Sequence, residues 1–137
     1  MAPKANHLIC IAFIACIFCL TSCSPQETPA PAASVPTHVL TQDKAGALTL
    51  AEQGDLLEVR LVEQPSTSGT WRLLQQTGSG RAESLGPAML VHDKTGTKRI
   101  FRFRAAQIGT LVLAFVFQEP NKTPQPEVGV AFSITIK

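Results

Sequence analysis

Few side chains in this sequence have the types and spacing that catalysis requires. Beyond the first residues the histidines are His38 and His92, which lie far apart and have no acidic residue at a spacing typical of metal ligands. No serine lies in a nucleophile-elbow sequence, and no glycine-rich loop of the phosphate-binding type opens a helix. Carboxylates do not cluster as calcium or magnesium sites require. The sequence therefore predicts a protein that is not an enzyme and that needs no cofactor and no metal.

The cysteines belong to an N-terminal leader. Lys4 precedes an uncharged apolar run, Leu8–Leu20, which is typical of a secretory signal peptide. The run ends in Leu-Thr-Ser-Cys, and this tetrapeptide resembles the lipobox of bacterial lipoproteins, in which the cysteine becomes the first mature residue and carries a lipid. We expect a signal peptide over residues 1–22 and lipidation of Cys23; an ordinary signal peptide with a chance cysteine is the alternative. All four cysteines lie in this region: Cys10, Cys16, Cys19 and Cys23.

The segment after the leader predicts a membrane tether. Residues 23–37 contain four prolines among small and polar residues, which is typical of an extended linker. Ser24 follows the expected lipidation site, and in bacteria with two membranes a residue other than Asp there favours the outer membrane. We therefore expect a cell-envelope protein anchored through Cys23. The charge of +2 (12 Lys and Arg against 10 Asp and Glu) falls to +1 without Lys4, which argues against nucleic acid as a partner.

The pattern of residues 38–137 predicts a single all-β domain, expected to be a monomer. Residues 56–63 and 128–136 alternate apolar and polar side chains, the signature of half-buried strands. Turn-rich links separate the expected strands, and residues 76–86 are predicted to form a loop. These features favour an immunoglobulin-like β-sandwich of seven to eight strands, with a small barrel as the alternative. The expected strands are residues 47–50, 56–63, 70–74, 88–91, 99–105, 110–117 and 128–136.

The link between two expected strands carries the clearest functional signal. Residues 64–71 read Gln-Pro-Ser-Thr-Ser-Gly-Thr-Trp, and Trp71 is expected in the core between the sheets. The segment resembles the chagasin family, which are inhibitors of papain-like cysteine peptidases. In that family an Asn-Pro-Thr-Thr-Gly loop is followed, after two intervening residues, by a Trp. Residues 54–61 and 96–110 also resemble the strands that flank the family's loops. The resemblance covers about residues 48–137.

The resemblance implies an immunoglobulin-like sandwich whose three loops at one end plug the cleft of a papain-like cysteine peptidase. Thr67 would lie at the tip of the first loop, nearest the catalytic cysteine of the peptidase. The second loop would span residues 92–96. The implied peptidase-binding residues are Gln64, Pro65, Ser66, Thr67, Ser68 and Gly69 in the first loop, Asp93, Lys94, Thr95 and Gly96 in the second, and Glu119, Pro120 and Asn121 in the third.

The three loops also depart from the family pattern. Gln64 replaces the family's Asn, and Glu119 and Asn121 replace the Arg and Trp of the third loop, which are residue types often found as binding hot spots. The glycine-rich second loop keeps only Gly96. A tight turn of Pro, Gly and small hydroxyl residues is an equally simple explanation of the first loop alone. A cell-envelope binding or structural module without inhibitory activity is therefore the alternative function.

Overall fold

The computed structural model describes residues 34–64, 69–120 and 129–137, all within one compact unit, Ala33–Lys137. The expected lipidation site Cys23 and most of the tether lie outside these residues. In the described part of the chain no helix is long and apolar enough to cross a membrane. Its elements are β1 (Thr37–Thr41), the 3₁₀ turn η1 (Gln42–Lys44), β2 (Leu48–Ala51), β3 (Leu56–Val62), β4 (Thr70–Gly78), β5 (Arg81–Ser84), β6 (Met89–Asp93), β7 (Gly96–Gln107), β8 (Gly109–Gln118) and β9 (Val130–Ile136).

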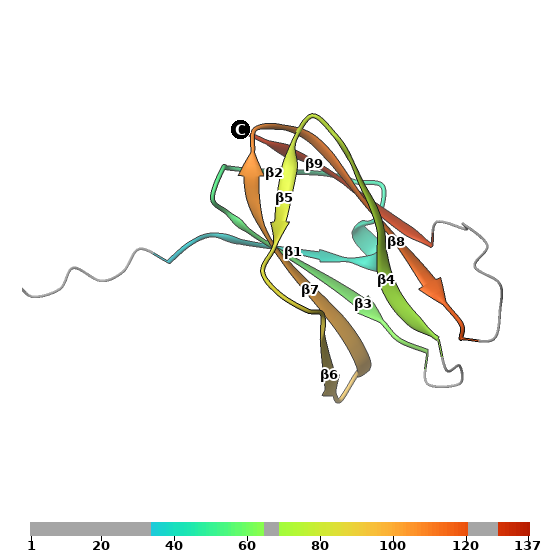
Figure 1. Ribbon diagram of the computed structural model, residues 1–137. Coiled ribbons are helices and arrows are strands. Elements are labelled where there is room, and N and C mark those ends of the chain that lie inside the picture. Colours follow the sequence, from blue (N-terminus) through green and yellow to red (C-terminus); the bar gives the residue numbers. More distant parts are fainter. Residues whose placement is uncertain (1–33, 65–68, 121–128) are drawn as a thin grey trace, which may run out of the picture. The chain divides into compact units, whose positions relative to one another are not determined.

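The strands form two mixed sheets that face each other (Figure 1). One sheet has the order β1-β3-β7-β5, with β6 also paired to β7; the other has the order β2-β9-β8-β4. The pairs β1–β3 and β2–β9 are parallel, whereas the remaining pairs are antiparallel. The expected all-β sandwich is confirmed. The long strand β7 is its organising element, because β3 lies along one side of it and β5 and β6 lie along the other.

The described residues contain nine strands, against the seven to eight expected. The predicted loop over residues 76–86 is wrong, because β4 continues to Gly78 and β5 occupies Arg81–Ser84. In β5 only Ala82 is buried, so the sequence lacks an apolar alternation, and pairing with β7 makes the strand. Leu73 lies opposite Phe115 in the same phase as Trp71, as the alternation of residues 70–74 predicts, but it is 38% exposed; a bulge follows it, between Leu73 and Gln75.

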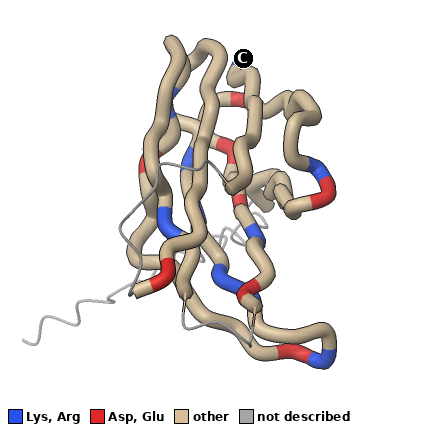
Figure 2. The backbone as a smooth tube through the Cα atoms, turned by 90° about the vertical axis from the view of Figure 1, so that its right-hand side faces the viewer, with Lys and Arg blue, Asp and Glu red and all other residues tan. Residues whose placement is uncertain are grey.

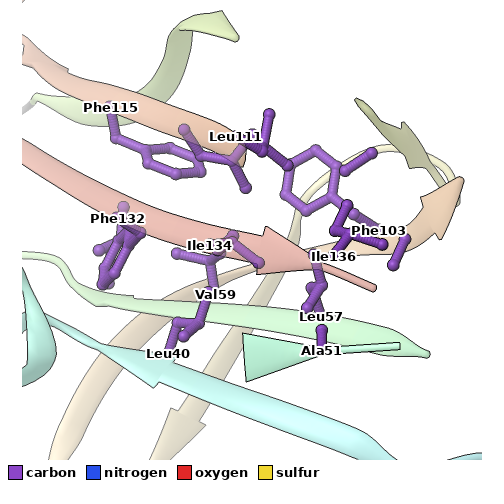
Figure 3. Packing of buried hydrophobic residues seen from close by; sticks show 14 of the residues in the cluster. Leu40, Ala51, Leu57, Val59, Phe103, Leu111, Phe115, Phe132, Ile134 and Ile136 are labelled. Carbon is purple, nitrogen blue, oxygen red and sulfur yellow. The ribbon is translucent and has the colours of Figure 1, made fainter. Parts of the chain in front are cut away.

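The core is built mostly from the alternating apolar residues that the sequence pattern singled out, joined by Leu40 of β1, a strand that the sequence did not predict. Figure 3 shows side chains of both sheets meeting between the layers. Each fully buried aliphatic or aromatic side chain contributes about 1.5–3 kcal/mol of transfer free energy. A domain of this size without cysteine therefore obtains its stability from apolar burial. The fully buried side chains are Leu40, Leu57, Val59, Leu61, Leu111, Leu113, Phe115, Phe132, Ile134 and Ile136.

Candidate interaction site at the loop end

Strand register brings the strand ends that flank the three predicted loops to one end of the sandwich, here called the loop end. Val62 at the end of β3 is opposite Lys98 near the start of β7, and Thr70 at the start of β4 is opposite Gln118 at the end of β8. The β3–β4, β6–β7 and β8–β9 connections therefore leave the sheets in the same direction, as the flanking strands in Figure 1 show.

Four of the six residues of the first predicted loop and one of the three residues of the third lie outside the described part of the chain. Residues 65–68 and 121–128 are not described. The predicted site residues Pro65, Ser66, Thr67, Ser68 and Asn121 therefore have no structural account here. Those that are described, all at the loop end, are Gln64, Gly69, Asp93, Lys94, Thr95, Gly96, Glu119 and Pro120.

The second predicted loop is a tight hairpin turn held by its own side chains. Asp93 Oδ1 accepts hydrogen bonds from the Thr95 backbone N–H (2.7 Å) and from Thr95 Oγ1 (2.5 Å), and Lys98 Nζ donates to Asp93 Oδ2 (2.8 Å). Lys98 and Thr95 thereby hold the pKa of the Asp93 carboxyl well below its usual range. Gly96 takes a φ of 121°, which side chains disfavour. The turn is therefore stiff even though it is exposed.

The tip of this hairpin carries an acidic and a basic residue, Asp93 and Lys94, whose surroundings differ. Adjoining acidic and basic segments lie at the lower tip of the tube in Figure 2. Asp93 is paired with Lys98, so the two charges largely cancel. Lys94 is exposed and belongs to the two-residue link between the strands. The hairpin thus presents one lysine at its tip on a turn whose other charges are internally balanced.

A polar contact joins the two ends of the first predicted loop. Glu63, just after β3, accepts hydrogen bonds at Oε1 from Arg99 Nε (2.5 Å) and from Thr70 Oγ1 (3.2 Å). The Glu63 side chain is only 13% exposed and that of Arg99 24%. The Glu63 N–H also donates to the Thr97 carbonyl, 2.9 Å away. The residues on either side of the β3–β4 connection are therefore fastened to each other and to β7.

An aromatic pair fastens the first and third connections to the core. The Trp71 and Phe117 rings meet edge-on, 5.4 Å between centroids, and Trp71 Nε1 donates to the Val62 carbonyl of the opposite sheet (2.9 Å). The backbone of Gly69 passes so close to the Phe117 ring that a Cβ would lie 2.6 Å from Cζ. A Cβ on Gly129 would lie 2.8 Å from Trp71 Cζ3. The expected core position of Trp71 agrees with its 8% exposure.

The basic run of β7 serves the structure of the domain. Lys98 pairs with Asp93, Arg99 with Glu63 and Arg102 with Glu58. Burial alone would raise the pKa of the Glu58 carboxyl, but hydrogen bonds from Arg60 and Arg102 outweigh it, and the pKa is lowered. Among residues 34–64, 69–120 and 129–137, no His, Cys, Asp and Glu side chains gather as three ligands for a metal ion.

Sequence reasoning missed the residues that fasten the loop end. Glu63 continues the inward phase of Leu57, Val59 and Leu61, and Arg99 shares the phase of Phe101 and Phe103. Two opposite charges at inward positions next to strand ends were a usable signal. The alternation of residues 110–117 places Phe117 on the inward face with Phe115, but the contact of its ring with Gly69 depends on how close the two segments come. No local pattern in the sequence carries that information.

Comparison with known proteins finds likeness in structure only. No family model and no curated protein sequence matches this chain. The solved structure of the cysteine protease inhibitor EhICP2 from Entamoeba histolytica superposes with a TM-score of 0.59 at 20% identity, over 79% of this chain and all of that one. The solution structure of amebosin gives a TM-score of 0.53 at 17% identity, over 76% of this chain and all of that one. At these identities the likeness shows a shared fold, which is the fold that the chagasin-family resemblance implied.

Proposed function

We propose that this protein is a lipid-anchored inhibitor of papain-like cysteine peptidases, which blocks the peptidase cleft reversibly with the three connections of the loop end. The observation that supports it most is that the strand ends flanking all three predicted loops lie at one end of the sandwich. A further support is the fold shared with EhICP2, a cysteine protease inhibitor. The reaction chemistry remains that of the peptidase, which the inhibitor only obstructs.

The loop end suits this task because its connections have rigid bases. Ordering a flexible segment on binding costs free energy, whereas a segment whose ends are already fixed loses less. The Asp93–Thr95–Lys98 contacts stiffen the second connection, and the Trp71–Phe117 pair supports the first and the third. Loops held in this way can fill a cleft with a small entropic penalty.

The test is inhibition of a panel of papain-like peptidases by residues 33–137. The fragment must include Pro36, because the Pro36 carbonyl accepts a hydrogen bond from the Leu56 N–H at 3.0 Å and β1 begins at Thr37. All strand pairing of the described chain lies inside this fragment. We expect reversible, competitive inhibition below micromolar concentration. A folded fragment that inhibits no member of the panel at micromolar concentration would exclude the proposal for these enzymes.

A substitution at Thr67 tests which surface is used. Thr67→Arg places a bulky charge at the centre of the proposed wedge and is expected to weaken inhibition about a hundredfold, as loss of a central contact does. Thr77→Arg is the matched control, because Thr77 is exposed near the other end of the sandwich. Equal inhibition by both variants would favour the alternative, a binding module that uses another face.

The proposed anchor is tested separately. In a bacterial host the full chain should incorporate labelled fatty acid and sediment with the membrane fraction, with outer-membrane vesicles where the host has them. Cys23→Ser should abolish both the labelling and the sedimentation. A serine variant that still sediments with the membrane would show that the attachment does not require a lipid on residue 23.

A further inference from the structure

We infer that Glu63, Thr70 and Arg99 form a clamp of positioning residues that fixes how the β3–β4 connection is presented to a partner. This inference rests on the proposed function for the identity of the partner. Two hydrogen bonds hold the clamp together: Glu63 Oε1 accepts one from Thr70 Oγ1 and one from Arg99 Nε. Glu63 and Thr70 are seven residues apart, on either side of the β3–β4 connection, whereas Arg99 is 36 residues from Glu63, in β7.

The geometry makes the clamp a link between two connections. Glu63 and Thr70 lie at the two ends of the first connection, so their hydrogen bond spans its base. Arg99 lies in β7, the strand that leaves the β6–β7 hairpin, and the Glu63 N–H bonds to the carbonyl of Thr97 in the same strand. A change in the position of Glu63 therefore moves the base of the first connection relative to the second.

The chemistry of the clamp explains why it stays closed. The Glu63 carboxylate is almost buried, and an unpaired carboxylate in such a place loses solvation without compensation. Arg99 supplies a charge-assisted hydrogen bond, the stronger kind. The Thr70 hydroxyl donates a second, weaker hydrogen bond to the same oxygen, Glu63 Oε1, and it carries no charge. Thr70 can therefore be altered with little effect on the charge balance, which makes it the sensitive position to test.

The experiment compares two substitutions at position 70 in the 33–137 fragment. Thr70→Val keeps the shape of the side chain and its preference for strands but removes the hydroxyl donor. Thr70→Ser keeps the donor. We expect Thr70→Val to weaken peptidase inhibition about three- to tenfold, the equivalent of one lost hydrogen bond. Thr70→Ser should inhibit like the unaltered protein. Thr77→Val, at an exposed position on the same strand, should inhibit like the unaltered protein.

A second measurement does not depend on any peptidase. Amide hydrogen exchange of the segment that contains Gln64 and Gly69 should be faster in Thr70→Val than in Thr70→Ser, while exchange in β8 stays the same. Arg99→Met should give a larger increase, and adding Thr70→Val to it should change little more, because the clamp is already open.

The outcomes separate the two proposals. Unchanged exchange and unchanged inhibition in Thr70→Val would overturn the clamp. Faster exchange with unchanged inhibition would also overturn it as a positioning device, because the contact would then be purely structural. If the unaltered fragment inhibits no peptidase, the proposed function fails, and the exchange comparison alone decides whether the clamp holds the connection.

Discussion

The two ends of the sandwich are fastened by different means. At the loop end, side chains hold the bases of long connections: the Glu63–Arg99 pair and the Trp71–Phe117 pair. At the opposite end, the backbone itself is close-packed. Gly80 N–H donates to the Thr110 carbonyl at 2.9 Å, and a Cβ on Gly109 would lie 2.6 Å from the Gly80 nitrogen.

The two ends therefore differ in how much sequence change the fold can tolerate. At Gly80 and Gly109 the opposite end leaves no room for a Cβ, so substitution of these glycines must disturb the sheets. The loop end keeps its fastenings below the connections, so residues beyond Gln64 and Gly69 can vary without loss of the fold. That arrangement is compatible with the departures of this chain from the chagasin loop pattern, such as Glu119 in place of Arg.

Substitution at Gly109 should give the largest effect on stability. Gly109 has a φ of 137°, and its missing Cβ leaves space for backbone atoms of Ser79 and Gly80. Gly109→Ala should lower the free energy of unfolding by about 3 kcal/mol, measured by chemical denaturation. Gly46→Ala is the control, because Gly46 has a φ of 81° with nothing within 4 Å, and it should cost about 1 kcal/mol. Equal costs at the two glycines would contradict the close-packed description of that end.

Asp55 offers a second, pH-dependent test of the same end. The backbone N–H of Glu52 and the His38 ring, both 2.8 Å from Asp55 Oδ2, lower the pKa of its carboxyl. A folded-state pKa below the unfolded value gives stability that is present above about pH 3.9 and lost as the pH falls through the folded-state pKa. Asp55→Ala should lower the free energy of unfolding by about 2 kcal/mol at pH 7.

The difference between the unaltered protein and Asp55→Ala should shrink steadily below about pH 4, as the carboxylate of the unaltered protein takes up its proton. Urea denaturation at several pH values measures it. Inhibition at pH 7 should remain unchanged in both proteins, because this turn lies at the end opposite to the loops. A constant difference down to pH 2 would show that the charge of Asp55 contributes nothing.

The smallest effect is expected at the hairpin tip. Asp93→Ala removes the acceptor of the Thr95 N–H and the partner of Lys98, so exchange of the Thr95 amide should be about fivefold faster. The transition temperature should hardly move, because the turn is exposed. In the unaltered protein, protection of this amide should persist below the usual pH range of Asp titration, since the pKa of Asp93 is lowered. Loss of protection near pH 4 would contradict this description.

Some features of the domain were accessible from sequence and others were not. The alternation around Leu57, Val59 and Leu61 predicted β3, and extending it by one step would have marked Glu63 as an inward charge awaiting a partner. The strand β5 was not accessible, because Arg81, Glu83 and Ser84 carry no apolar pattern and only the edge of β7 orders them. The bulge between Leu73 and Gln75 was not accessible either, because it changes the register of β4 without any local marker in the sequence.

The sequence by itself determined the all-β class, the apolar faces of β3, β7, β8 and β9, and the position of Trp71, because a period of two and turn residues are properties of neighbouring positions. Only the tertiary structure decided which connections share an end, that Glu63 meets both Thr70 and Arg99, and that Gly69 and Gly129 lie against aromatic rings. Apart from Glu63–Thr70, which spans a single connection, those contacts join residues distant in the chain. Strand register and the separation of the two sheets set them, and neither quantity is a local property of the sequence.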